Sequence, residues 1–264
     1  MQQALKIQYL SDLHFEFGYN RNLFHKQKYR KACGDVLVIA GDLDYLDKSG
    51  EYSRGYTREY LSWAGDNYEM VYIVPGNHEY WGESPYDLSN AFAPYRIQFA
   101  SNVILGSNIV EEYLGLKFAL STLWYRVNFN IERFLKSNER RWVRCNGDSI
   151  TVDIINRLNS TCIDFLKESR ADIVVTHHAP TYRIMHPIFE TDKSNEQFYN
   201  NLDGIIAELA PQAWIFGHLH YSDMRESDIF LPTRLITNPL GYAWEEKTGF
   251  KVNSILEVDQ KGLS

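Results

Sequence analysis

The feature that most constrains this chain is a set of five short apolar segments, each followed directly by polar residues. The segments cover residues 5–10, 36–40, 71–74, 172–176 and 213–216. Their length and their content of β-branched and aromatic residues indicate short, buried strands. Open α/β sheets place their functional sites beyond the carboxyl ends of such strands. The chain is therefore expected to be an α/β protein with a site at these strand ends.

The polar residues after the segments are carboxylates, an amide and imidazoles. In chain order they are Asp12 and His14, Asp42, Asn77 and His78, His177 and His178, and His218 and His220. Taken singly, each cluster is also compatible with a capped turn or a surface histidine. Neighbouring strand tips in one sheet lie ~5 Å apart, so these clusters can meet in one place.

The spacing within two of the clusters favours metal binding. Asp12 and His14 are two residues apart, which on an extended chain directs both side chains to the same face. His218 and His220 repeat this spacing directly after a glycine, which suits a local chelate. Pro180 prevents a helix from starting directly after the histidine pair at 177 and 178.

The candidate ligands outnumber those that a single metal ion uses. They are Asp12, His14, Asp42, Asn77, His177, His218 and His220. This set suits two divalent or trivalent ions that share a carboxylate. Because it contains no thiolate, it favours Mn, Fe, Zn, Co or Ni and argues against a cysteine-type structural zinc site. Two divalent ions outweigh two carboxylates in charge, so the site would attract an anionic phosphate.

Composition and charge limit the classes of function. With 264 residues, 44% of them hydrophobic, the chain can form a sizeable core, and one domain over residues 1–264 is expected. A net charge of -7 disfavours bulk nucleic-acid binding. Three cysteines without framework spacing favour free thiols. No signal-like segment and no run of ~18 apolar residues occurs, so a cytoplasmic protein without a membrane span is expected.

The rest of the chain supplies helices and further strands. Residues 51–67, 150–169 and 196–209 show helical periodicity, and residues 109–120 indicate a hairpin with Gly115 in the turn. Residues 235–237 and 254–258 are expected to be strands. Residues 82–100 are expected to be irregular, 181–195 a loop, and 127–149 a lid or insertion.

The order of these motifs resembles that of the calcineurin-like metallophosphoesterases. The matching blocks are Asp12-Leu13-His14, Gly41-Asp42, Gly76-Asn77-His78-Glu79, His177 and Gly217-His218-Leu219-His220. The resemblance implies a four-layer αββα sandwich of two mixed sheets flanked by helices, with a dinuclear metal site at the strand ends. Residues 121–124 and 238–242 are similar to segments of small bacterial members whose substrates are unassigned.

The resemblance also implies a role for each motif residue. Asp42 would bridge two ions. Asp12, His14 and His220 would complete one site, and Asn77, His177 and His218 the other. His177 is preferred to His178 because family versions with paired histidines use the first. The ions would lower the pKa of a shared water toward ~7 and present hydroxide in line with the leaving oxygen. His78 would not be a ligand; it would protonate the leaving group or bind a phosphoryl oxygen.

The expected function is metal-dependent hydrolysis of a small phosphomonoester or phosphodiester. Leu43, Asp44 and Tyr45 follow Gly41-Asp42, where the protein-phosphatase branch continues toward Asp-Arg-Gly, so protein dephosphorylation is not expected. The alternatives are a nuclease or nucleotide phosphohydrolase of the same fold, and a non-catalytic scaffold. The scaffold is disfavoured because His78 and all seven candidate ligands are present. Candidates for the pocket wall are Tyr80, Trp81, Tyr125, Arg126, Tyr182 and His186.

Overall fold

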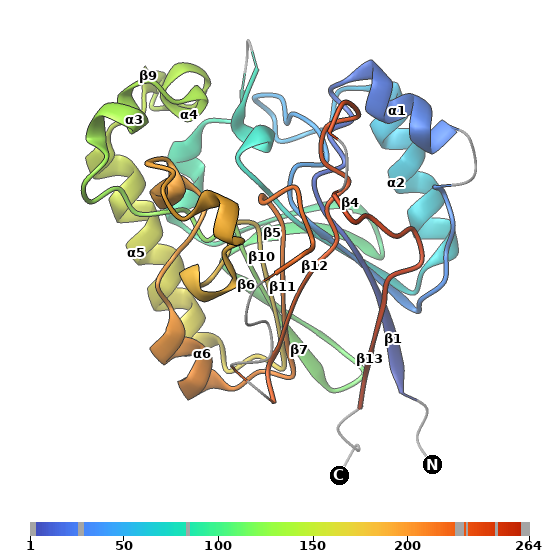
Figure 1. The fold of residues 1–264 in the computed structure, drawn as a ribbon. Coiled ribbons are helices and arrows are strands. Elements are labelled where there is room, and N and C mark those ends of the chain that lie inside the picture. Colours follow the sequence, from blue (N-terminus) through green and yellow to red (C-terminus); the bar gives the residue numbers. More distant parts are fainter. Residues whose placement is uncertain are drawn as a thin grey trace.

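Two mixed β-sheets stack face to face in this computed structural model, and helices cover the outer face of each (Figure 1). The structure describes residues 4–25, 29–82, 85–224, 230, 232–245 and 248–259. The arrangement has four layers, helix, sheet, sheet and helix, which confirms the expected fold class.

In the described part of the chain, the first sheet has six strands in the order β13-β1-β2-β3-β5-β4. Its bounds are β1 Leu5–Leu10, β2 Val36–Ala40, β3 Met70–Val74, β4 Tyr95–Ala100, β5 Val103–Ser107 and β13 Ile255–Val258. The central strands β1, β2, β3 and β5 run parallel, whereas β13 and β4 pair antiparallel at the two edges. Parallel neighbours end at the same side of the sheet, so the tips of β1, β2 and β3 lie together.

The second sheet has five strands in the order β12-β11-β10-β7-β6. Its bounds are β6 Ile109–Tyr113, β7 Leu116–Ser121, β10 Ile173–Thr176, β11 Ala213–Phe216 and β12 Arg234–Thr237. The predicted hairpin is confirmed as β6 and β7, and the other neighbours are parallel. A small separate hairpin joins β8 Arg144–Cys145 to β9 Asp148–Ser149.

Among the residues that the structure describes, six α-helices accompany the sheets. They are α1 Gly18–His25, α2 Gly55–Asn67, α3 Ile131–Leu135, α4 Asn138–Trp142, α5 Val152–Ser169 and α6 Asp203–Leu209. Tyr60, Leu61 and Ala64 of α2 pack on the outer face of the first sheet. Leu158, Cys162 and Leu166 of α5 pack on the outer face of the second. The side chain of Thr151 caps α5 by accepting from the Ile154 N–H, which fixes where that helix begins.

The apolar layer between the sheets is built from the inward faces of both. Ile7, Val38 and Tyr72 from the first sheet meet Phe118 and Val175 from the second, and all five are fully buried. Side chains that are buried on both faces of a strand explain why the segments at 36–40, 71–74 and 213–216 are apolar throughout. This layer holds the two sets of strand tips in one fixed relation.

Three expectations about secondary structure were wrong in part. The helix expected at 51–67 begins only at Gly55. Residues 82–100 are not irregular throughout, because Tyr95–Ala100 form edge strand β4 with alternating burial. The helix expected at 196–209 begins only at Asp203. The segment before it is held instead by backbone bonds from the N–H groups of Asn200 and Leu202 to the carbonyls of Ala179 and Pro180, which keep that segment out of a helix.

Residues 127–149 form α3, α4 and the small hairpin. The three cysteines, Cys33, Cys145 and Cys162, are free thiols. Among the described residues, none of the helices combines the length and the hydropathy that crossing a bilayer requires.

Candidate metal centre

The polar clusters lie where the two sheets meet at their strand ends. Asp12, Asp42 and Asn77 follow β1, β2 and β3 of the first sheet, whereas His177 and His218 follow β10 and β11 of the second. The expectation that one sheet would bring the clusters together is corrected, because the five tips belong to two stacked sheets. Hydrogen bonds cross this junction: His177 Nδ1 lies 2.9 Å from the Ala40 carbonyl oxygen, and the His218 N–H donates to Asp12 Oδ1 at 3.0 Å.

Potential ligand atoms gather in three overlapping groups, each within 4.8 Å. The groups are Asp12, His14 and His220; His14, Asp42 and His78; and Asp42, His177 and His218. Asn77 joins the last group, because its Oδ1 lies 2.9 Å from His177 Nε2. The structure thus brings together all seven candidate ligands and also places His78 among them.

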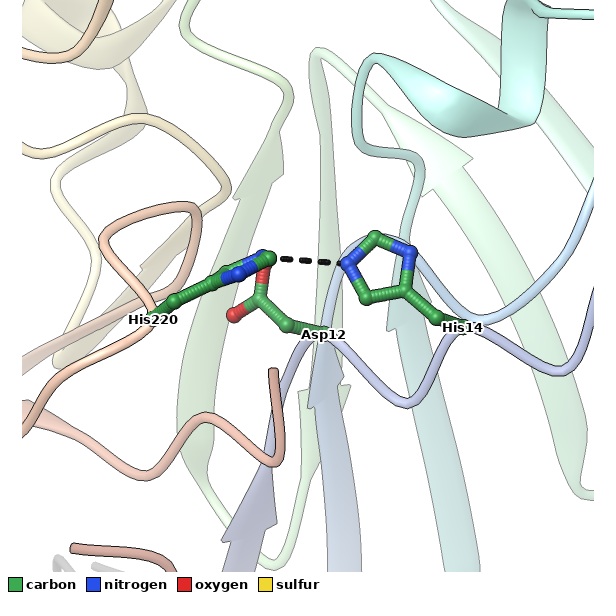
Figure 2. Close-up of side chains that lie close together, drawn as sticks. All are labelled: Asp12, His14 and His220. Atoms are coloured by element: carbon green, nitrogen blue, oxygen red, sulfur yellow. Dashed lines mark hydrogen bonds and ion pairs between the residues drawn. The ribbon is translucent and has the colours of Figure 1, made fainter. Parts of the chain in front are cut away.

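Imidazole nitrogens face one another at two points of the centre. His14 Nε2 lies 3.0 Å from His220 Nε2, with the Asp12 carboxylate beside the two rings (Figure 2). His177 Nε2 lies 3.1 Å from His218 Nδ1. Between the two pairs, Asp42 Oδ1 lies 3.5 Å from His177 Nε2 and Asp42 Oδ2 lies 3.8 Å from His14 Nε2. Donor atoms that converge from several sides around one carboxylate are what metal ions require, so the residues fit such ions.

Several candidate ligands have left-handed backbones. Asp12 has φ 54°, His14 50°, Asp42 56°, His218 70° and His220 52°. The expectation that Asp12 and His14 converge because the chain is extended was therefore wrong. They converge because each strand turns sharply at its tip, a conformation that Asp, Asn and His adopt more readily than most residues. Such outliers cluster at functional sites.

Two glycines allow the loops to approach one another closely. A Cβ on Gly41, which has φ 89°, would overlap the His177 ring, and a Cβ on Gly76 would overlap the Asp42 carboxylate. Only glycine therefore fits at either position without a shift of the groups that form the centre.

Glu16 is a site residue that the motifs did not identify. Its Oε1 lies 2.9 Å from His14 Nδ1 and 2.7 Å from His78 Nδ1, and its side chain is buried. Because Oε1 accepts from both Nδ1–H groups, both rings direct Nε2 toward the centre. The alternation of Asp12, His14 and Glu16 in the sequence was the signal that could have found it.

Three more glutamates hold the loops in place. Glu79 accepts from the N–H groups of Asp42, Leu43 and Gly76, so it joins the turns after β2 and β3. Glu139, from α4, accepts from Asn77 Nδ2 at 2.9 Å, which directs Asn77 Oδ1 to the centre. Glu245 lies 2.8 Å from His220 Nδ1. Nothing in the spacing of the sequence connects Glu139 or Glu245 with the motifs.

The buried charges influence one another strongly. Burial lowers the pKa of His14. Burial also acts to lower the pKa of His78, but the carboxylates of Asp42 and Glu16 outweigh it and raise that pKa. In the same way, Asp42 outweighs burial and raises the pKa of His177 to about 9. Asp12 and Glu245 raise the pKa of His220 to about 10, again against burial. A metal ion that binds His177 and His220 would therefore have to displace protons from these rings.

His178 lies outside the three groups of donor atoms. Its Nδ1 lies 3.3 Å from the Thr122 carbonyl oxygen, and burial together with nearby His177 lowers its pKa to about 3. Its ring lies near those of Trp124 and His218, at centroid distances of 5.6 Å and 4.4 Å. A neutral ring that supports its neighbours accounts for its position.

A cavity of about 490 Å³ opens directly onto the centre. Asp42, Asn77, His78, His218 and His220 form its floor. Residues from 136–139, 189–199, 219–221 and 242–245 form its walls. Of the six residues suggested for the wall, Trp81 lines the cavity, whereas Tyr80, Tyr125, Arg126, Tyr182 and His186 do not. The predicted lid segment thus contributes to the wall through α4.

Comparisons with known proteins give a family match and relatives of similar length and fold. The family model for calcineurin-like phosphoesterase matches residues 5–222. The chain is 26% identical over 279 residues to the uncharacterized protein L509 of Acanthamoeba polyphaga mimivirus, covering 96% of this chain and 97% of that one. The phosphopantetheinyl hydrolase PptH of Mycobacterium tuberculosis has a similar fold, with a TM-score of 0.64 at 17% identity, covering 98% of this chain and 97% of that one. The chain belongs to the calcineurin-like phosphoesterase family, whose members are metal-dependent hydrolases of phosphoesters.

Proposed function

We propose that this chain hydrolyses small phosphate monoesters or diesters with the help of two metal ions held by seven side chains. The observation that supports this most directly is the overlap of the three donor groups, in which Asp42 and His14 each belong to two. Shared donors are typical of two-metal sites, whereas separate groups would suggest independent ions. Asp42 would be shared by both ions. Asp12, His14 and His220 would hold one, and Asn77, His177 and His218 would hold the other.

His78 would supply the proton transfer that the ions do not. When bound, the ions would lower the pKa of a water and neutralise charge on the phosphoryl oxygens. His78 keeps Nδ1 on Glu16, so Nε2 is free to act in the cavity, where it lies 3.9 Å from Asp42 Oδ2 and 3.4 Å from the Tyr242 hydroxyl. The carboxylates of Asp42 and Glu16 raise the pKa of this ring, which favours its protonated form and suits transfer of a proton from Nε2 to the leaving oxygen.

We expect two metal ions per chain after reconstitution with manganese, measured by elemental analysis on protein that has passed a desalting column. Because ligand histidines must lose their protons, affinity should rise with pH until the pKa values of His177 and His220, about 9 and about 10, are passed. Glu59 provides a control, because its side chain is 60% exposed and pairs with Arg30, so Glu59→Gln should leave the metal content unchanged. A stoichiometry that never exceeds one would contradict the dinuclear centre.

We expect Glu16→Gln to lower kcat by about 10–100-fold, the usual cost of losing a group that orients site residues. The amide keeps the size of Glu16 but can no longer accept from both Nδ1–H groups with a full negative charge. The loss should fall on kcat more than on KM and should be greater for alkyl than for nitrophenyl esters, because His78 is affected. An equal loss on both ester types would mean that Glu16 acts through the metal ligand His14 alone.

A further inference from the structure

We propose that the cavity beside the metal centre selects phosphoesters that carry a single phosphate on a neutral, planar leaving group. The inference rests on the proposed function and adds the substrate class. It follows from two properties of the cavity wall, which are its charge and its aromatic surface.

The described wall carries more negative than positive charge. Asp192, Glu139 and Glu245 line the cavity, whereas Lys136 is the one Lys or Arg among the described residues that do so. Its charge is partly offset by Glu132, because Lys136 Nζ lies 2.6 Å from Glu132 Oε1, and its side chain is 69% exposed to solvent, which screens what remains. A second phosphate or a carboxylate on the leaving group would need cationic partners that this wall does not supply.

The wall carboxylates are held in place. Glu139 accepts from Asn77 Nδ2, and Glu245 lies 2.8 Å from His220 Nδ1. Ser194 donates both its backbone N–H and its hydroxyl to Asp192 Oδ1. These bonds, with Arg133 nearby, keep the pKa of Asp192 below its usual range. Rotation therefore cannot easily remove the negative charge that a second anionic group would meet.

Aromatic rings begin at the metal centre and continue outward along the wall. Trp81 stacks on His78 with a centroid distance of 3.7 Å, and Phe198 lies 4.8 Å from the His218 ring. Farther out, Phe189 stacks on Tyr221 at 5.3 Å. All four non-histidine rings line the cavity. Flat apolar surfaces of this kind favour a planar group without charge, as in most small-molecule sites.

The test compares 4-acetamidophenyl phosphate with 4-carboxyphenyl phosphate. The two phenols have similar acidity, so the chemical step should differ little, and the second ester adds one negative charge at the far end of the leaving group. With the manganese-loaded protein, kcat/KM is expected to favour the neutral ester by about tenfold, since one like-charge contact at ~4–8 Å in a partly solvated cavity is worth on the order of that factor.

Two variants test whether the cavity wall causes the preference for the neutral ester. Asp192→Asn should shrink the ratio of the two kcat/KM values several-fold, whereas Asp164→Asn, on the exposed side of α5, should leave it unchanged. Phe189→Ala should raise KM for the neutral aryl ester. The matched control is Phe129→Ala, because Phe129 is 88% exposed and does not line the cavity.

The possible outcomes distinguish a failure of the proposed substrate class from a failure of the proposed function. Metal-dependent turnover with equal rates, or with a preference for the carboxyphenyl ester, would overturn the substrate class and leave the proposed function standing. A ratio that Asp192→Asn does not change would likewise overturn the role of the wall. Absence of turnover on both esters would overturn this inference, and absence of metal-dependent turnover on the diester bis(4-nitrophenyl) phosphate as well would overturn the proposed function.

Discussion

Replacing Asp42 by Asn is expected to lower turnover by about 10³-fold or more, because one substitution removes the negative charge that both proposed ions share. Asp42 is buried, and its two oxygens lie 3.5–3.9 Å from His177, His14 and His78. Asn has nearly the same shape and tolerates the left-handed backbone at φ 56°. The fold should therefore persist, and the loss of turnover should reflect the missing negative charge rather than a change of structure.

The measurement is kcat together with metal content on the same preparation. Asp42→Asn should weaken both ions, whereas His220→Ala should weaken mainly one, since His220 belongs to a single donor group. Asp172→Asn is a suitable control, because Asp172 is also buried but precedes β10 at the opposite end of the sheet. Full retention of two ions by Asp42→Asn would contradict its place between them.

His78→Ala is expected to lower kcat by ~10²–10⁴-fold while both metals remain, which corresponds to roughly 3–5 kcal/mol of barrier. The loss should depend on the ester. Alkyl esters need a proton as they depart, whereas nitrophenolate leaves readily without one, so alkyl esters should suffer more. His78→Gln is a useful second variant, because a side chain closer in size leaves less of a void against Trp81.

Two results would change the assignment of His78. An equal loss on alkyl and nitrophenyl esters would favour a role in binding a phosphoryl oxygen. Loss of an ion would mean that His78 is a metal ligand. This outcome has to be tested, because His78 belongs to a donor group with His14 and Asp42. His186→Ala should have little effect on either quantity, because that ring does not line the cavity.

The sequence predicted the parts of this protein that depend on local patterns. Apolar runs located the strands, and the polar residues after them located the centre, because a strand tip and the turn beyond it are adjacent in the chain. Glu139 and Glu245 could not be found in this way, since they reach Asn77 and His220 from 62 and 25 residues away. Strand β4 was missed because an edge strand that is half exposed lacks a continuous apolar run.

The left-handed backbone at residues 12, 14, 42, 218 and 220 lowers the stability of the folded state while it directs the donor side chains to the centre. Each such residue costs on the order of 1 kcal/mol relative to glycine, a sizeable share of a net stability of about 5–15 kcal/mol. Glycine at one of these turns would relieve the backbone strain but would remove a donor atom, and at residue 12 or 42 it would also leave the N–H of His218 or His78 without its acceptor. The same five turns therefore carry both the backbone strain and five of the candidate donor side chains, so a substitution that relaxes one of them also removes a donor from the centre.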